Sequence, residues 1–153
     1  MAIKGFFENP VFLSVITSWF SAQLIKTVIY LLRSKVKNPH DTFGILMWRT
    51  GGMPSSHSAT VASMSASTGL FEGPDSTLFI ITLMLALIII RDALGVRRSS
   101  GIQARVLNKL GRQMSEKLNI EYFPVKEVPG HTPLEVAIGV FLGIIIAFAF
   151  HFL

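Results

Sequence analysis

The sequence contains no cysteine and few charged residues. None of the 153 residues is Cys, and only 15% are Asp, Glu, Lys or Arg. The lack of cysteine excludes disulfides, thiolate catalysis and cysteine-based metal sites. The scarcity of charge accompanies a hydrophobic content of 50% and a mean hydropathy of +0.54. Because the apolar residues come in blocks, this composition predicts an integral membrane protein, and the length predicts a single domain over residues 1–153.

The basic residues are unevenly distributed along the chain. Of the 14 Lys and Arg residues, 12 fall in the stretches Arg33 to Arg49 and Arg91 to Lys126, whereas the connection from Glu72 to Asp75 is acidic. The positive-inside rule would place both basic stretches in the cytoplasm. Membrane topology therefore explains the net charge of +5, and nucleic acid is not an expected partner. Residues 1–10 show no cleavage site for a signal peptide.

Four apolar segments can be recognised in the sequence. The first is long enough to span about 30 Å of hydrocarbon, whereas the second and third must extend at their ends to do so. Small residues in the second segment predict that it is buried among its neighbours. Charged residues at helical spacing over residues 91–119 predict an amphipathic helix at the membrane surface. The fold class is therefore an all-α integral membrane protein with about four transmembrane helices plus an interfacial cytoplasmic helix. The apolar segments are about Phe12–Leu32, Ser58–Phe71, Thr77–Ile90 and Pro133–Leu153.

This topology predicts that four polar clusters meet on one membrane face. With the N-terminus outside, Lys26 lies near the inner end of the first helix and His57 begins the second. Asp92 and Arg97 follow the inner end of the third helix, and His131 precedes the fourth. The expected location is a bacterial inner membrane, with this face and the basic loops in the cytoplasm.

The run Pro54-Ser55-Ser56-His57 combines the features of an anion site with a proton donor. Proline suits the start of a helix, and serine hydroxyls beside free N-terminal amides favour an anion. A histidine placed there can protonate a leaving oxygen. The alternative is that the serines only cap a helix and that the histidine is an interfacial residue.

A second histidine begins the last apolar segment. Thr132 followed by Pro133 and Glu135 predicts a capping box, which would by itself explain the glutamate. His131 and Glu135 are also four residues apart, so that the carboxylate can orient the imidazole. An oriented histidine can attack phosphorus as a nucleophile. Both interpretations remain open from the sequence.

Several cations surround these histidines in the predicted topology. Lys26 lies within an apolar helix, where a charge is costly and indicates function, although snorkelling to the surface is an alternative. Arg97 and Arg98 can present planar forks to a phosphate or bind anionic head groups. Arg49 lies just before the glycine pair. Asp92 could pair with an arginine or help to bind a cation.

Three stretches together resemble a known superfamily. Gly51 to Ala59, Asp92 to Ala104 and Gly130 to Val136 are similar to the divergent branch of the type-2 phosphatidic acid phosphatase superfamily, which includes the vanadium-dependent haloperoxidases. The superfamily has Pro-Ser-Gly-His where this chain has Ser56 in place of the glycine. It has Asp where this chain has Glu135, and its first motif is more compact. The resemblance implies phosphate contacts from Lys26, Arg49, Ser55 and Arg97 or Arg98, protonation by His57, and a nucleophilic His131 oriented by Glu135.

The sequence therefore predicts a membrane phosphatase that hydrolyses a lipid phosphate or pyrophosphate through a phosphohistidine. The predicted reaction needs no cofactor and no metal. One alternative is a non-enzymatic membrane protein that binds or transports phospholipid or isoprenoid phosphate head groups, and another is a structural membrane subunit. Gly139 and Gly143 form a G-x-x-x-G spacing that suits close helix packing, including that of a homodimer.

Overall fold

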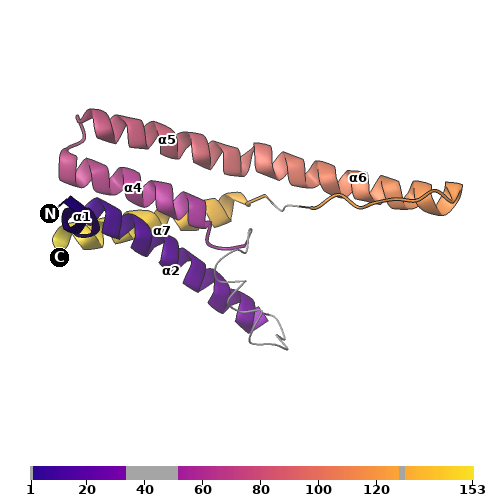
Figure 1. Ribbon diagram of the computed structural model, residues 1–153, viewed down its shortest axis with the longest axis horizontal. Helices are drawn as coiled ribbons and strands as arrows, with labels where there is room; N and C mark the ends of the chain where they lie inside the picture. Colours follow the sequence, from indigo (N-terminus) through magenta and orange to yellow (C-terminus); the bar gives the residue numbers. More distant parts are fainter. Residues whose placement is uncertain (1, 34–51, 128–129) are drawn as a thin grey trace.

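The computed structural model describes residues 2–33, 52–127 and 130–153, with side chains from residue 5 onward. These residues form helices joined by loops, and no strand occurs among them. Figure 1 shows α2, α4, α5 and α7 side by side, with both termini at one end of this bundle and α6 projecting from the other. The helices are α1 (Ala2–Phe7), α2 (Pro10–Arg33), α4 (Ser56–Glu72), α5 (Thr77–Leu94), α6 (Val96–Leu118) and α7 (Pro133–Phe152).

Three helical stretches are long and apolar enough to cross a membrane. They are Pro10–Leu32, the run Thr77–Leu118 that begins with α5, and Pro133–Phe152. The remaining predicted segment forms α4, which has 17 residues and is rich in Ser, Ala and Thr. The all-helical membrane architecture predicted from the sequence is thus confirmed. α4 differs from the other three in its burial, since nine of its 17 residues are buried and it packs against α2, α5 and α7.

Short polar side chains determine where the bundle helices begin. The Asn9 side chain accepts hydrogen bonds from the amides of Val11 and Phe12 at the start of α2. Ser55 caps α4, and Ser76 caps α5 through the amide of Phe79. These caps satisfy amides that have no partner within the helix, which is essential where water is scarce. The caps therefore fix which residues stand at each end of the bundle.

Glycines allow α7 to approach α4 closely. A Cβ atom on Gly139 would lie 2.5 Å from the carbonyl oxygen of Ser55, and one on Gly143 would lie 2.3 Å from that of Ala59. Any larger residue would force the two backbones apart. The G-x-x-x-G spacing thus packs two helices of the same chain. It is explained without a second copy, and the homodimer stays a prediction.

α6 and the segment after it form a hairpin outside the bundle. Asn119, in the left-handed conformation, caps the end of α6, and residues 120–127 run back along the helix. The buried Asn108 side chain donates to the Val125 carbonyl and accepts from the Val125 amide, each at 2.8 Å, and also bonds Tyr122 and Glu127. We call α6 with residues 119–127 the basic hairpin. One buried amide holds its returning segment.

Candidate functional site

His131 and Glu135 form a hydrogen-bonded pair at the start of α7. The capping box is present: the Thr132 hydroxyl accepts from the Glu135 amide at 3.3 Å, and Glu135 Oε2 accepts from the Thr132 amide at 2.9 Å. The same carboxylate oxygen lies 3.2 Å from Nδ1 of His131. Both readings of Glu135 therefore hold at once, since one carboxylate caps the helix and orients the imidazole. This contact uses Nδ1 of His131 and leaves Nε2 for a contact with another group.

A backbone hydrogen bond links the start of α4 to the start of α7. The Ser55 amide donates to the Glu135 carbonyl at 3.0 Å. Ser55 is fully buried, and its hydroxyl accepts from the hydroxyl of Ser58 at 2.9 Å and from the Ser58 amide. Ser56, the first residue of α4, is also buried. This geometry matches the capping role of the serines and places His57 beside the His131 motif.

His57 lies in the first turn of α4, outside the three candidate spans. His57 is exposed, but the chain around it removes part of its water and thereby lowers its pKa. The positive charge of Arg97 lowers the pKa further, followed by His131 and Lys26, whereas Asp92 raises it. These groups come from four different parts of the chain. Their mutual influence shows that the predicted clusters converge.

Burial also lowers the pKa of His131, which is only 6% exposed. The hydrogen bond and the negative charge of Glu135 oppose this effect, and the charges of Lys26 and Arg97 add to it. The net result is a histidine that stays neutral at lower pH than usual. A neutral imidazole that donates from Nδ1 to a carboxylate has its lone pair on Nε2, which is the form required of a nucleophile.

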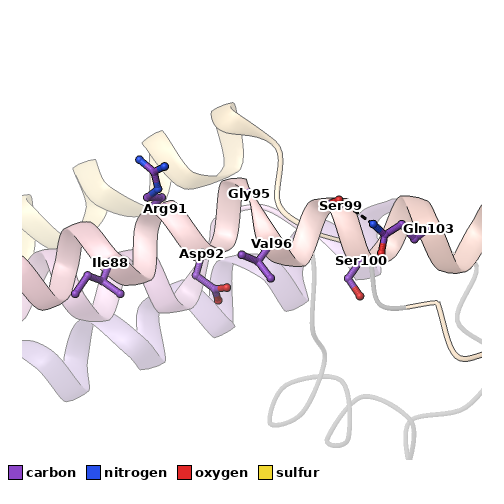
Figure 2. Close-up of a pocket in the computed structure, with 8 residues that line it drawn as sticks. All are labelled: Ile88, Arg91, Asp92, Gly95, Val96, Ser99, Ser100 and Gln103. Carbon is purple, nitrogen blue, oxygen red and sulfur yellow. Dashed lines mark hydrogen bonds between the residues drawn. The ribbon is translucent and has the colours of Figure 1, made fainter.

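Arg97 is held at the junction of α5 and α6 by an ion pair. Its Nε lies 2.6 Å from Oδ2 of Asp92, and both side chains retain exposed surface. Asp92 thus pairs with an arginine, one of the two roles predicted for it. Figure 2 shows Asp92 on one side of α5 and Arg91 pointing to the opposite side. Arg97, and not Arg98, is among the charges that act on both histidines.

Lys26 is buried within α2 and is only 4% exposed. Its stem passes beside Gly52, where an added Cβ would lie 3.8 Å from its Cγ. Its charge acts on both histidines, so the ammonium group belongs to the same cluster. Arg49 falls outside the described residues. We call Lys26, His57, Arg97, His131 and Glu135 the site cluster.

Gly130 is a residue of this site that the sequence analysis did not single out. A Cβ on Gly130 would lie 2.3 Å from Cα of Arg98 and 2.5 Å from its amide nitrogen. The backbone before His131 therefore packs directly on the first turn of α6, which carries Arg97. The signal in the sequence was a glycine immediately before a histidine, but its partner lies far along the chain. Arg98 contributes this backbone contact while its side chain is exposed.

Among the described residues, no group of three His, Cys, Asp or Glu side chains is arranged to hold a metal ion. The site cluster contains three cations or potential cations around one carboxylate-bound histidine. Such a cluster attracts an anion, and histidines in this setting have the chemistry of a nucleophile and of a proton donor. The arrangement is therefore chemically suited to phosphoryl transfer.

Comparison with known proteins gives one family and one curated relative. The family described as the divergent PAP2 family matches residues 7–146. An uncharacterised membrane protein of Bacillus subtilis (strain 168), YuiD, is 38% identical over 145 residues, which cover 88% of this chain and 89% of that protein. No solved structure matches the chain. The matched region includes all the residues of the site cluster.

Proposed function

Because this chain belongs to the divergent PAP2 family, we propose that it is a membrane phosphatase that acts on a lipid phosphate or pyrophosphate through a phosphohistidine. The observation that carries the proposal is the 3.2 Å contact between His131 Nδ1 and the Glu135 carboxylate. This contact orients the ring and leaves Nε2 as the nucleophilic atom. The membrane location of the protein supports a lipid as the substrate.

In the first step, Nε2 of His131 attacks the phosphorus atom. A phosphorus–nitrogen bond forms as the bond from phosphorus to the leaving oxygen breaks. His57, in its protonated form, donates a proton to that oxygen, so the product leaves as an alcohol or a lower phosphate. Glu135 stabilises the positive charge that develops on the imidazole of His131. Lys26 and Arg97 stabilise the negative charge on the phosphoryl oxygens.

In the second step, water releases the phosphoryl group. Neutral His57 takes a proton from the water molecule, and the oxygen atom of this water attacks phosphorus. The phosphorus–nitrogen bond then breaks, inorganic phosphate leaves, and His131 returns to the neutral form. His57 ends the cycle protonated, as it began. Arg49, Arg98, Ser55 and Ser56 remain proposed phosphate contacts, and the complete burial of Ser55 favours its capping role.

The test is phosphate release by the purified protein in detergent, with and without EDTA. Phosphatidic acid, phosphatidylglycerophosphate and a polyprenyl pyrophosphate are assayed separately. We expect turnover of at least one lipid, and a loss of about 10³-fold or more in His131→Ala. His151→Ala is the matched control, because His151 lies at the opposite end of α7 against Phe71, with ring centroids 5.2 Å apart. It should retain wild-type turnover.

Turnover that persists in both His131→Ala and His57→Ala would contradict the mechanism. A folded wild-type protein without turnover would contradict the phosphatase itself. In that case, head-group binding that persists in the double histidine variant would favour the non-enzymatic alternative, since binding needs the cations but not both histidines.

A further inference from the structure

The α5–α6 rod is longer than a bilayer is thick. The helical run Thr77–Leu118 contains 42 residues. At a rise of 1.5 Å per residue it extends over about 60 Å, roughly twice the hydrocarbon thickness. Figure 1 shows α6 continuing in the direction of α5 beyond the ends of α2, α4 and α7. If α5 spans the membrane, α6 must therefore lie outside the hydrocarbon.

The part of the rod outside the bundle nevertheless exposes many apolar side chains. Ile102, Val106, Leu110, Met114 and Leu118 follow one another at intervals of four residues, and each is more than half exposed. The returning segment adds Phe123, which is 75% exposed. Water-soluble proteins rarely expose a continuous apolar surface of this kind unless something covers it. The hairpin therefore requires an apolar partner.

The spacing of these residues favours a membrane surface over a second helix. With a spacing of four residues, each successive side chain is shifted a little further around the helix. The result is a broad arc instead of the narrow seam of a coiled coil. Polar Ser99, Gln103 and Lys117 fall within the arc. They would interrupt a helix–helix seam but can be accommodated at a lipid interface, where long side chains reach the head groups.

The charge of the hairpin complements an anionic membrane. Residues 96–127 contain seven Lys and Arg residues and three Glu residues, a net charge of +4 (7 − 3). Arg105 is partly neutralised by Glu127, whose carboxylate lies 3.6 Å from its Nε. Lys109 and Arg112 are exposed on the side of the helix away from the centre of the apolar arc. Basic residues beside an apolar surface favour anionic lipid head groups.

The apolar face of α6 is also continuous with the outer face of α5. A hollow at the junction is lined by Ile88, Asp92, Val96 and Ser100 among others, and Figure 2 shows these four along one side of the rod. A second hollow shares Ser100 and Gln103 with the first and continues to Leu110 and Val125. The outer face of α5 is largely unburied by protein and suited to lipid. One lipid-compatible surface thus runs from α5 onto the hairpin.

We propose that the basic hairpin docks on the anionic lipid surface of the leaflet next to the site cluster. Docking requires the rod to bend, and the bend falls at Gly95, the single residue between α5 and α6, where φ is −103° and ψ is −84°. The apolar arc enters the interface and the basic side chains contact lipid phosphates. Since Arg97 lies only two residues after Gly95, the docked hairpin brings an anionic surface beside the site cluster.

The absence of cysteine makes a direct test simple, because each introduced cysteine is the only one to react. Val106→Cys and Leu110→Cys place a nitroxide on the apolar arc, and Arg112→Cys is the matched control on the basic side. All three positions are exposed, so the label should not disturb folding. Each protein is reconstituted into phosphatidylcholine vesicles with or without an equal part of phosphatidylglycerol. Collision with oxygen and with a water-soluble nickel chelate measures the depth of the label.

In the anionic vesicles we expect the Val106 and Leu110 labels to be reached by oxygen and protected from nickel, while the Arg112 label stays aqueous. Omitting phosphatidylglycerol, or adding Lys109→Gln and Arg112→Gln to the Val106 and Leu110 label variants, should lower the ratio of docked to free hairpin by about tenfold or more. Three labels of equal aqueous exposure in the anionic vesicles would overturn the proposal. Spin–spin broadening that disappears on dilution with unlabelled protein would overturn it in favour of a second copy.

Discussion

The site cluster and the basic hairpin share Arg97 at the start of α6, yet the contacts that hold the two regions together differ in kind. Around the site cluster, backbone packs on backbone: Gly130 on Arg98, Gly139 on Ser55 and Gly143 on Ala59. In the hairpin, side chains make the contacts, and the buried Asn108 side chain holds the returning segment. The first arrangement leaves no space between the backbones for an added Cβ atom, whereas the second depends on the side chain of one residue.

This difference agrees with the roles proposed for the two regions. A nucleophile must be held close to its productive position, because a displacement of about 1 Å can cost about 10²-fold in rate. A surface that docks on lipid only needs to present its apolar arc, and its partner is fluid. Close backbone contact through glycine therefore suits the site, and a clamp on an exposed helix suits the hairpin.

The largest effect on activity is expected from Gly130→Val, which disrupts one of the backbone contacts around the site cluster. The new side chain would collide with the backbone of Arg98 and push His131 away from Arg97 and His57. We expect kcat/KM for the lipid phosphate to fall by about 10²-fold. The matched variant is Gly111→Val in the hairpin, whose side chain would collide with the ring of Tyr122 instead. It should stay within about threefold of wild type in detergent, because a ring can move where a backbone cannot.

Equal losses in the two glycine variants would show that the hairpin positions the site after all. Elution as a single folded species is required of both proteins, so that misfolding is not mistaken for displacement.

Stability should respond next to Gly143→Val in the contact between α7 and α4. The added atoms would meet the Ala59 carbonyl oxygen at 2.3 Å and the Ser63 amide nitrogen at 2.8 Å. Forced separation of packed helices costs about 1–3 kcal/mol. We expect a lower midpoint of thermal unfolding in detergent. Gly5→Val is the control, because no atom lies within 4 Å of its added Cβ. An unchanged midpoint in Gly143→Val would mean that α4 and α7 do not pack as described.

A smaller and local effect is expected from Asn108→Ala in the hairpin. The variant removes both Val125 hydrogen bonds and those to Tyr122 and Glu127. Each bond contributes about 1 kcal/mol or less to the order of the returning segment. Hydrogen exchange at the Val125 amide should accelerate by about tenfold or more, while exchange in α4 and α7 stays unchanged. Acceleration throughout the bundle would show that the hairpin and the bundle unfold as one unit.

The sequence predicted most of the helices and the meeting of the clusters. The helix starts at Ser55 and Thr132 could be predicted from the sequence, because capping is a local interaction. Alternate crossings of the membrane, predicted from the basic and acidic connections, place Lys26, His57 and His131 at one end of the bundle. Pattern and topology were sufficient for these features.

Contacts between distant parts of the chain could not be predicted from pattern and topology. The sequence predicted that Gly139 and Gly143 suit close packing but could not say that their partner is α4 of the same chain. It gave no sign that Gly130 packs on Arg98 or that Asn108 holds residues 120–127. Such contacts depend on which surfaces the bundle brings together. Arg49, which was predicted to contact phosphate, lies outside the described residues and stays a prediction.

The smallest effect expected is a shift in the pH profile of Glu135→Gln. The carboxylate raises the pKa of His131 through its hydrogen bond and its charge, because it stabilises the protonated ring. A glutamine can still accept from the Thr132 amide but carries no charge, so the pKa of His131 should fall further. Nucleophilic attack needs neutral His131, which is lost below this pKa. The acid limb of kcat/KM, which reports the free enzyme, should therefore move to lower pH.

The basic limb of the same profile supplies an internal control. Along this limb kcat/KM falls as His57 gives up its proton. Glu135 is not among the groups that shift the pKa of His57. Glu135→Gln should thus move the acid limb and leave the basic limb in place, with a lower maximum because the imidazolium is less stabilised in the transition state. An acid limb that stayed in place would show that Glu135 caps α7 without acting on the charge of His131. The carboxylate would then belong to the structure of the bundle alone, and His131 would need another group to orient it.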